Sequence, residues 1–308
     1  MSSPPKVVVV GSINMDLVIR CDHLPVPGET ITAQSSLEIP GGKGANQSVA
    51  AARAGGEVSM LGRVGDDSMA NRLLENLQQQ GVKTETVLRT AQCPSGIAVV
   101  AVEASGENAI MVVPGANGRV SVEDIDAAEA MLRNATILLL QLEIPIATVL
   151  RVIAIAKEAG IPVILDPAPM PRSLPIEALR VDLICPNESE ASAIVGYDVT
   201  NVESAESACN DLVGLGVRRA IVTLADKGAV IHDGSRTQWI EPFEIEPVDT
   251  TAAGDAFAGA LAVELADGKP LLDSARFASA AGAIAATRLG AQVAMPKRQE
   301  IEQLVRST

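Results

Sequence analysis

Short apolar runs recur along the chain and alternate with longer stretches that have helical spacing. A run of three to five apolar residues without polar alternation is typical of a strand buried on both faces. The predicted strands are Val7–Val10, Ile137–Leu140, Val163–Leu165, Leu183–Cys185 and Ala220–Leu224. The predicted helices between them include Glu123–Leu132, Ile146–Ala159 and Ala205–Leu215. This alternation predicts an α/β fold whose central, mostly parallel sheet has helices on both faces.

Two stretches, Leu17–Ile39 and Ser95–Val113, carry few helical signals and are predicted to form β-structure. In the second, apolar runs on either side of the turn Ala104–Asn108 indicate a hairpin. We expect both stretches to build a small sheet that covers a ligand. The chain, 1–308, is then one α/β domain with a discontinuous β lid formed by about 15–40 and 94–116.

The run Gly96–Val102 is apolar on both alternating faces, and a lid over one ligand buries only one of them. We therefore expect a homodimer that forms through the lid. The alternative is that both faces are buried within one chain.

Composition excludes several classes of protein. The chain is 47% hydrophobic but only 2% aromatic, so its core is aliphatic. The net charge is −14 and no Lys/Arg run is present, which argues against nucleic-acid binding. Small phosphates remain compatible with this charge, because backbone N–H groups at helix starts can bind them.

Targeting and metal signals are weak. The start, MSSPPK, lacks the basic and apolar segments of a signal peptide, and no apolar run is long enough to span a membrane. We therefore expect a cytoplasmic protein. The four cysteines form no CxxC pair, so we expect reduced thiols packed as small apolar groups rather than a zinc site.

The strongest chemical signal is Asp249–Asp255, which leads into the predicted helix Asp255–Ala266. Its small residues, Ala252, Ala253 and Gly254, leave backbone N–H groups uncovered at the positive end of a helix, which suits a phosphoryl group in its transition state. Asp255 can orient a hydroxyl and take its proton late in a loose phosphoryl transfer. The alternative is that Asp255 caps the helix and the small residues make a turn.

Two further motifs carry polar side chains suited to hydroxyl groups. Gly41–Asn46 leads into the predicted helix Gln47–Ala54 and does not match a P-loop; Lys43 and Asn46 in it can bond hydroxyls, or it is a plain glycine-rich turn. Asn14 and Asp16 follow the first strand, where ligands of open α/β sheets bind. The alternative for this pair is ordinary turn residues.

Two weaker motifs also follow strands. Asn187 and Glu190 open a helix, where Asn187 can bond a phosphate and Glu190 can organise Mg²⁺; the same residues also fit a structural capping box. The loop Thr223–Gly228 can hold the phosphates or ribose of a nucleotide, or it is a hairpin turn.

Taken together, these motifs resemble the PfkB-type carbohydrate kinase family. GGKGANQSVAAARAG resembles its first signature and DTTAAGDAFAGAL its second. The order VVVVGSINMD, GGKGAN, QLE, DPAP, PNESE, TLADKG, DTTAAGD, TRLGAQ extends over nearly the whole chain and is more specific than any single motif.

The resemblance implies a role for each matching position. Asp255 would be the base, and the anion hole would be formed by Ala252, Ala253 and Gly254. The sugar would be held by Asn14, Asp16, Gly42, Lys43, Asn46, Glu143 and Asp255. ATP and its Mg²⁺ would be served by Asn187, Glu190, Thr223, Lys227, Gly228, Gly254 and Ser279. A monovalent cation, usually K⁺, would lie among the backbone carbonyls around Asp249, Thr251, Ala285, Arg288 and Gly290.

Three positions depart from the family pattern. Ala225 replaces a frequent Gly, so its loop is expected to adopt a different backbone. Ser279 stands where His or Asn is frequent near the adenine, which would reshape the base pocket. Ala294 replaces a frequent Ser in the cation loop, which puts potassium affinity in doubt.

The polar character of the inferred site favours a neutral sugar. Several buried polar groups discriminate strongly by hydroxyl pattern. A nucleoside kinase would need aromatic side chains to sandwich a base, and the predicted sugar-binding residues include none. Arg20 and Arg63 are candidates for binding an anionic sugar, but Asp16 and Glu143 argue against one.

We therefore expect ATP-dependent phosphorylation of D-ribose at its 5-hydroxyl, which gives ribose 5-phosphate and ADP. One alternative is a kinase for another neutral sugar, such as deoxyribose or fructose. Another is a non-catalytic sugar-binding regulator. The presence of both Asp255 and the small anion-hole residues counts against the regulator.

Overall fold

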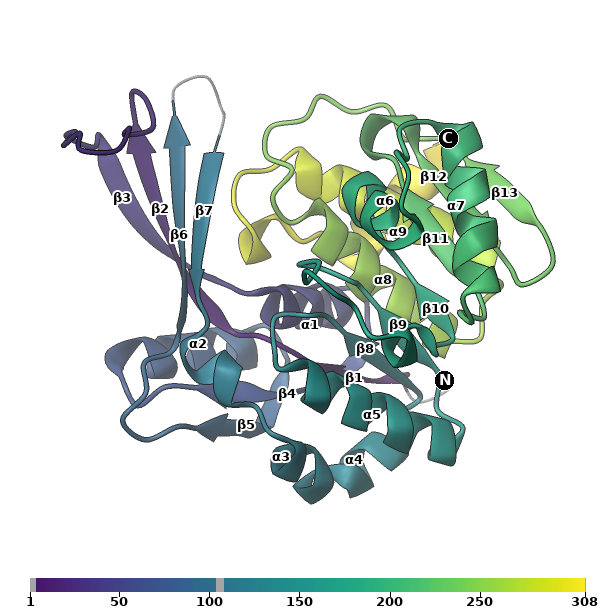
Figure 1. Cartoon of the computed structure of the whole chain (residues 1–308), viewed down its shortest axis with the longest axis horizontal. Helices are drawn as coiled ribbons and strands as arrows, with labels where there is room; N and C mark the ends of the chain where they lie inside the picture. Colours follow the sequence, from purple (N-terminus) through teal and green to yellow (C-terminus); the bar gives the residue numbers. More distant parts are fainter. Residues whose placement is uncertain (1–3, 104–107, 308) are drawn as a thin grey trace.

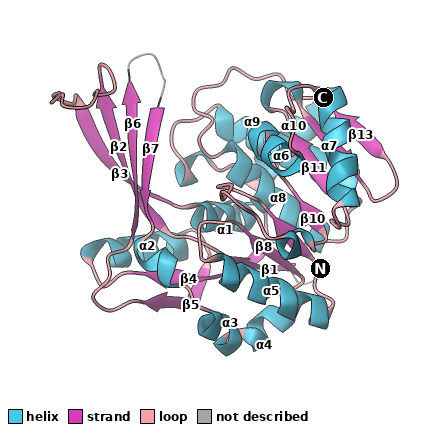
Figure 2. Cartoon of the chain, in the orientation of Figure 1, coloured by secondary structure: helices cyan, strands magenta, loops and turns pink. Residues whose placement is uncertain are grey.

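The computed structural model describes residues 4–103 and 108–307 and has a nine-stranded main sheet with a separate four-stranded sheet (Figures 1 and 2). The main sheet has the order β13-β12-β11-β10-β9-β8-β1-β4-β5. Its strands are β1 (Lys6–Val10), β4 (Glu57–Val64), β5 (Lys83–Arg89), β8 (Ile137–Leu140), β9 (Val163–Leu165), β10 (Leu183–Ile184), β11 (Ala220–Thr223), β12 (Ala229–His232) and β13 (Thr237–Ile240). The helices are α1 (Lys43–Arg53), α2 (Ser68–Gln79), α3 (Val122–Ala127), α4 (Glu129–Arg133), α5 (Ile146–Ala159), α6 (Glu188–Val195), α7 (Val202–Gly214), α8 (Ala253–Ala266), α9 (Leu271–Ala286) and α10 (Arg298–Ser307).

The layering follows from the alternation of side chains along β1. Val7 and Val9 belong to the core that α1, α8 and α9 cover, whereas Val8 and Val10 belong to the core under α5 and α7. A strand whose two faces are both buried needs an unbroken apolar run, and β1 has one. The predicted α/β fold with helices on both faces of a mostly parallel sheet is confirmed.

The outer strands of the main sheet were not predicted. β5 lies at one edge and alternates buried with exposed residues, so it lacks the continuous apolar run that marks the inner strands. β12 and β13 pair antiparallel at the other edge. The predicted helix Glu123–Leu132 is wrong as one element, because α3 ends at Ala127 and α4 begins at Glu129.

The four-stranded sheet, called the small sheet below, projects from the main body (Figure 1). Its strands, in spatial order, are β3 (Ser35–Gly41), β2 (Asn14–Cys21), β6 (Gly96–Glu103) and β7 (Asn108–Val113). β6 and β7 pair antiparallel as predicted, while residues 104–107 of the predicted turn lie outside the described part of the chain. β2 begins at Asn14, before the predicted start at Leu17, so Asn14 and Asp16 are strand residues.

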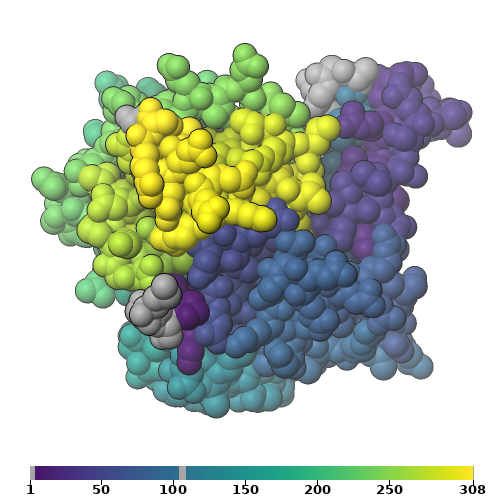
Figure 3. Space-filling model, turned by 180° about the vertical axis from the view of Figure 1, so that it is seen from behind, coloured from purple at the N-terminus to yellow at the C-terminus, as the bar shows by residue number. Residues whose placement is uncertain are grey.

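Helices α1 and α8 pack closely through small residues. A Cβ added at Gly259 would lie 2.6 Å from both the Ala50 Cβ and the Gln47 carbonyl oxygen, so this contact requires glycine. The close approach brings the first turns of the two helices together. Seen from behind in Figure 3, the C-terminal helix α10, in yellow, lies on the surface beside the N-terminal part of the chain. Among the described residues, no helix combines the length and apolarity needed to cross a bilayer.

Candidate active site

The first turn of α1 has acceptors for all of its leading N–H groups. Helix α1 starts at Lys43, four residues before the predicted start at Gln47, so four of the six residues in the predicted glycine-rich turn are helical. Gly42 precedes it with φ of 88°, a conformation that favours glycine. The four donor–acceptor pairs are Lys43 N to Glu143 Oε2 (3.1 Å), Gly44 N to Ser12 Oγ (3.3 Å), Ala45 N to Ser12 O (2.9 Å) and Asn46 N to Gly42 O (2.8 Å). The carboxylate of Glu143 therefore already occupies the positive end of α1.

The first turn of α8 is open. The N–H of Ala253 donates to the Thr250 carbonyl at 3.1 Å, and that of Ala256 donates to the Ala252 carbonyl at 2.9 Å. No side chain caps this helix. Among the described residues, the N–H groups of Gly254 and Asp255 have no hydrogen-bond acceptor. Two free donors at the positive end of a helix suit this turn to binding an anion.

The two helix starts meet at Asp255, which is 4% exposed. Its Oδ2 accepts from the Asn46 amide at 2.9 Å, and its Oδ1 accepts from the Gln47 amide at 3.0 Å. The Lys43 ammonium lies 3.8 Å from Asp255 and 3.6 Å from Asp166. The predicted base and two predicted sugar-binding side chains thus share one cluster.

Three buried acceptors in or beside this cluster have no partner. Among the described residues, Asp16 Oδ1, Asn46 Oδ1 and Gln141 Oε1 are buried without a hydrogen bond. An unpaired buried acceptor is costly, and a hydroxyl of a bound sugar would satisfy it. Gly41 is needed here, because a Cβ at that position would lie 2.0 Å from Asp16 Oδ2.

The other two predicted sugar-binding residues are held from within the protein. Asn14, 3% exposed, accepts from the Asn117 amide at 2.6 Å. Glu143 accepts from the Ser12 hydroxyl as well as from the Lys43 N–H. Asn117 and Ser12 were not predicted, and they position these side chains.

The cluster has more negative than positive groups. Burial raises the pKa of Asp16 from 3.8 to about 7, with repulsion from Glu143 and Asp255 adding to the effect. Burial also raises the pKa of Asp166 to about 7, against the attraction of Lys43. Burial opposes a charged Lys43, but the carboxylates of Asp166 and Asp255 raise its pKa above the ordinary value, so it stays an ammonium.

The residues predicted to serve the nucleotide lie on two neighbouring loops. Asn187 caps α6 and forms a capping box with Glu190, whose Oε2 accepts from the Asn187 N–H at 2.9 Å. Thr223 is joined to Asn187 by an isolated parallel bridge. Burial raises the pKa of Glu190, and the charges on Lys43 and Asp255 also act on it, so Glu190 lies near the polar cluster.

The Thr223–Gly228 loop connects the antiparallel strands β11 and β12, as the hairpin alternative predicted. The Lys227 ammonium donates a hydrogen bond to the Thr200 carbonyl at 2.8 Å. Gly228 has a φ of 87°. Ala225 has φ of 50°, so it adopts a left-handed conformation that glycine adopts more readily. Ser279 is half-buried on α9.

The residues predicted to surround a monovalent cation come together from two loops. Asp249 accepts from the Thr251 N–H at 3.0 Å and from the Gly290 N–H at 2.9 Å. Burial would raise the pKa of Asp249, but these hydrogen bonds hold it below the ordinary value. Arg288 pairs with Glu300, and Ala285 is buried. Asp249 therefore joins the loop before α8 to the loop after α9.

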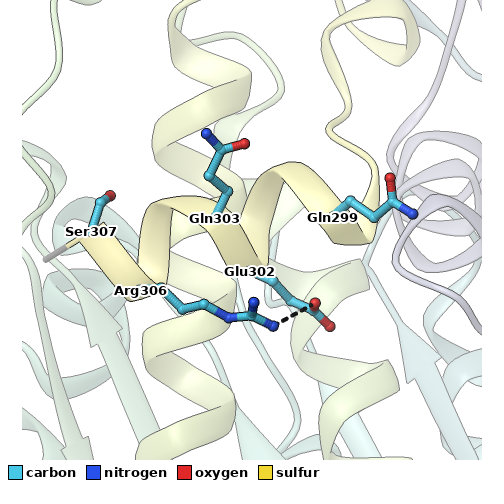
Figure 4. A pocket seen from close by; sticks show the side chains of 5 residues that line it. All are labelled: Gln299, Glu302, Gln303, Arg306 and Ser307. Carbon is cyan, nitrogen blue, oxygen red and sulfur yellow. Dashed lines mark hydrogen bonds and ion pairs between the residues drawn. The ribbon is translucent and has the colours of Figure 1, made fainter.

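Three polar residues of the cluster were missed by sequence reasoning: Gln47, Gln141 and Asp166. Gln141 and Asp166 directly follow the buried strands β8 and β9, which was a usable signal because ligand-facing residues gather at carboxyl ends of parallel strands. Gln47 carried no signal, since its role depends on what lies across from α1. A shallow surface hollow on α10, shown in Figure 4, is lined by Gln299, Glu302, Gln303, Arg306 and Ser307, none of which belongs to the predicted site.

Comparisons with known proteins agree on one family. Residues 4–298 match the model of the pfkB family carbohydrate kinases. A ribokinase of Haemophilus influenzae is 38% identical over 293 residues, which is 95% of each chain. A deoxyribokinase of Salmonella typhi is 38% identical over 257 residues, 83% of this chain and 84% of that protein. The structure of Arabidopsis thaliana ribokinase complexed with ribose and ATP superposes with a TM-score of 0.91 at 35% identity and covers 99% of each chain.

Proposed function

Because the chain belongs to the pfkB family of carbohydrate kinases, we propose that it transfers the γ-phosphoryl group of ATP to the 5-hydroxyl of D-ribose. The products are ribose 5-phosphate and ADP. One observation carries the proposal: Asp255, at the open start of α8, lies within hydrogen-bonding distance of Asn46 at the start of α1. This contact places the open start of α8 directly beside the polar cluster.

In the proposed reaction, the sugar hydroxyl oxygen forms a bond to the γ-phosphorus as the bond from that phosphorus to the β-phosphate oxygen breaks. The hydroxyl proton passes to the Asp255 carboxylate late in the step, since a free Asp has a pKa of about 3.9 and cannot deprotonate an alcohol beforehand. The free N–H groups of Gly254 and Asp255 stabilise the negative charge on the transferred group. Ala252 and Ala253 keep the approach to these donors free of bulky side chains.

The sugar side of the pocket is assigned to Asn14, Asp16, Gly42, Lys43, Asn46 and Glu143. Asp16 Oδ1 and Asn46 Oδ1 supply two unpaired acceptors for hydroxyl donors. The Lys43 ammonium can donate a hydrogen bond to a hydroxyl oxygen of the sugar. The exposed fraction of the Lys43 side chain is 30%, so a ligand can reach it.

Magnesium fits this site only indirectly. In the described part of the chain, no group of three or more His, Cys, Asp or Glu side chains is arranged to hold a metal ion. Mg²⁺ commonly uses one or two carboxylates together with substrate phosphates and water, and it neutralises phosphate charge when bound. Glu190 would orient such water ligands with the carboxylate oxygen that its capping box leaves free, and Asn187 would face the phosphates.

A potassium site is proposed where Asp249, Thr251, Ala285, Arg288 and Gly290 come together. The fit rests on the Asp249–Gly290 hydrogen bond, which brings two carbonyl-rich loops to the start of α8. Replacing K⁺ by a large organic cation should lower the rate of phosphoryl transfer. An equal rate in both salts would remove the potassium proposal and leave the kinase proposal standing.

The small sheet is proposed to act as a lid of this single domain and as a dimer contact. Its strands carry exposed apolar side chains: Leu37 is 61% exposed, Ile110 54% and Met111 64%. Pairing with a second copy would bury this surface. Sedimentation analysis should give a dimer for the wild type and a shift toward monomer for Met111→Glu, and a wild-type monomer would contradict the dimer.

The decisive experiment measures ATP consumption with ribose, deoxyribose, fructose and adenosine. Ribose should be the best substrate. Deoxyribose is the second candidate, because one relative of equal identity is a deoxyribokinase. Asp255→Ala should abolish most turnover, by about 10²–10⁴-fold, while sugar binding survives. Unchanged turnover in this variant would refute the role of Asp255, and no turnover of any sugar by the wild type would leave only a sugar-binding regulator.

A further inference from the structure

The side chain of Gln47 has no role in the proposed mechanism, yet it connects two charged groups of the polar cluster. Gln47 lies on α1 directly after Asn46 and is fully buried. Its Nε2 donates to Asp255 Oδ1 at 3.0 Å and to Asp166 Oδ2 at 2.7 Å. An amide nitrogen has two hydrogens, so both are used on carboxylates.

The orientation of this amide is fixed by its surroundings. Gln47 Oε1 accepts from Gln141 Nε2 on the opposite side. If the Gln47 amide were rotated by half a turn, its oxygen would face two carboxylates and its nitrogen would face the Gln141 donor. Gln141 Oε1 lies beside Gly11, where a Cβ would lie 1.9 Å from it, and this oxygen has no hydrogen-bond partner among the described residues.

The Gln47 amide bridges two buried carboxylates that repel each other. Asp255 and Asp166 are both buried, and Lys43 is placed between them at 3.8 and 3.6 Å. One ammonium cannot neutralise two carboxylates, so they repel each other unless a neutral donor holds both. Without that donor, Asp255 Oδ1 would lose its hydrogen bond, and the carboxylate would be held only by the Asn46 amide and the Lys43 ammonium.

We propose that Gln47 is a positioning residue for phosphoryl transfer, and that it fixes the Asp255 carboxylate by bonding Asp255 and Asp166 through one amide that Gln141 orients. This inference rests on the proposed sugar kinase activity. It assigns Gln47 no contact with the sugar or with ATP. A displacement of about 1 Å at a reacting group can cost on the order of 10²-fold in rate, so loss of the bridge should reduce turnover rather than substrate affinity.

The first variant is Gln47→Glu, which keeps the shape of the side chain but removes both amide hydrogens. Because the new carboxyl group also adds repulsion beside Asp166 and Asp255, an uncharged second variant is needed to separate positioning from charge. With positioning, kcat should fall by about 10²-fold while KM for ribose changes by less than about threefold. The second variant, Gln141→Leu, leaves Gln47 in place but frees its amide to rotate, and it should give a smaller fall in kcat.

The pH profile separates positioning from loss of stability. Donors that bond a carboxylate favour its charged form, and the Gln47 amide acts in this way on Asp166, so removing it raises the pKa of Asp166. Other charged groups that act around Asp255 are Lys43 of α1, Asp166 after β9, Asp16 of β2 and Glu190 of α6. The acid limb of kcat should therefore move to higher pH in both variants.

The matched control is Thr148→Val on α5, which loses a buried hydrogen bond to the Val120 carbonyl far from this cluster in the sequence and on the other face of the sheet. It should lower the melting temperature while keeping kcat and the acid limb. A wild-type kcat in Gln47→Glu and Gln141→Leu, or a fall in kcat with an unmoved acid limb, would overturn the proposal. If Gln47→Glu does not fold, Gln141→Leu decides alone. Absence of sugar phosphorylation by the wild type would instead refute the proposed function.

Discussion

The first turns of α1 and α8 are built from similar small residues, yet they treat their backbone N–H groups in opposite ways. At α1, the Glu143 carboxylate and Ser12 satisfy the leading donors. At α8, the N–H groups of Gly254 and Asp255 have no acceptor in the described part of the chain, and no side chain caps the helix. The two turns lie next to each other because Gly259 lets the helices pack closely.

Under the proposed function, this difference would place the sugar at the start of α1 and the phosphoryl group at the start of α8. The start of α1 is already neutralised by an internal carboxylate, so it presents polar side chains suited to uncharged hydroxyls. The start of α8 keeps free N–H groups and a positive field, which suit a phosphoryl group. Asp255 belongs to α8 but bonds side chains of α1, so it stands at the boundary where a hydroxyl and a phosphoryl group would meet.

The largest effect is expected when the start of α8 is given a carboxylate of its own, as in Gly254→Asp, which removes the difference between the two helix starts. An added Cβ at Gly254 meets nothing within 4 Å, and a carboxylate near a helix N-terminus is favourable, so stability should be kept. The rate of phosphoryl transfer should fall by about 10²–10³-fold, since the new charge competes for the free N–H groups. Gly254→Ala should lose much less activity. Equal losses in the two variants would point to steric obstruction instead of charge.

The converse change removes the carboxylate at α1, as in Glu143→Gln. Charge-assisted hydrogen bonds from the Lys43 N–H and the Ser12 hydroxyl would become neutral ones, at a loss of about 1 kcal/mol. Sugar affinity, measured by calorimetry, should fall by up to about tenfold. The control is Glu129→Gln, which breaks an exposed ion pair with Arg133 and should leave affinity unchanged. An unaltered affinity in Glu143→Gln would mean that the charge at α1 does not matter for the sugar.

The smallest expected effect is a dependence of sugar affinity on pH. The pKa of Asp16 is raised to about 7, and hydroxyl donors favour its ionised form, so sugar binding should release a proton near neutral pH. Affinity should weaken below pH 7, by severalfold at about pH 6, and Asp16→Asn should show a flat pH dependence. The same shift lowers stability as pH rises from about 4 to about 7, because the folded state binds the extra proton. Proton release measured by calorimetry in two buffers tests this, and a pH-independent affinity in the wild type would contradict it.

Much of this molecule could be predicted from local pattern. Three elements have the predicted bounds: the strands Ile137–Leu140 and Val163–Leu165 and the helix Ile146–Ala159. An inner strand, or a helix buried on one side, has a recognisable pattern of apolar residues within a short segment. The edge strand β5 could not be predicted in this way, since it is half exposed and lacks a continuous apolar run. The early start of α1 at Lys43 was also missed, because the acceptors that satisfy its first N–H groups come from distant Glu143 and Ser12.

The sequence by itself determined the fold class, the small-residue helix starts, and which residue types can do chemistry near them. The tertiary structure decided how these residues are used. Two similar helix starts became different sites because only α1 meets a carboxylate from far along the chain, and Gln47 became a bridge because Asp166 and Asp255 converge on it. Hydrogen-bond partners separated by more than a hundred residues leave no local pattern, so folding alone brings them together.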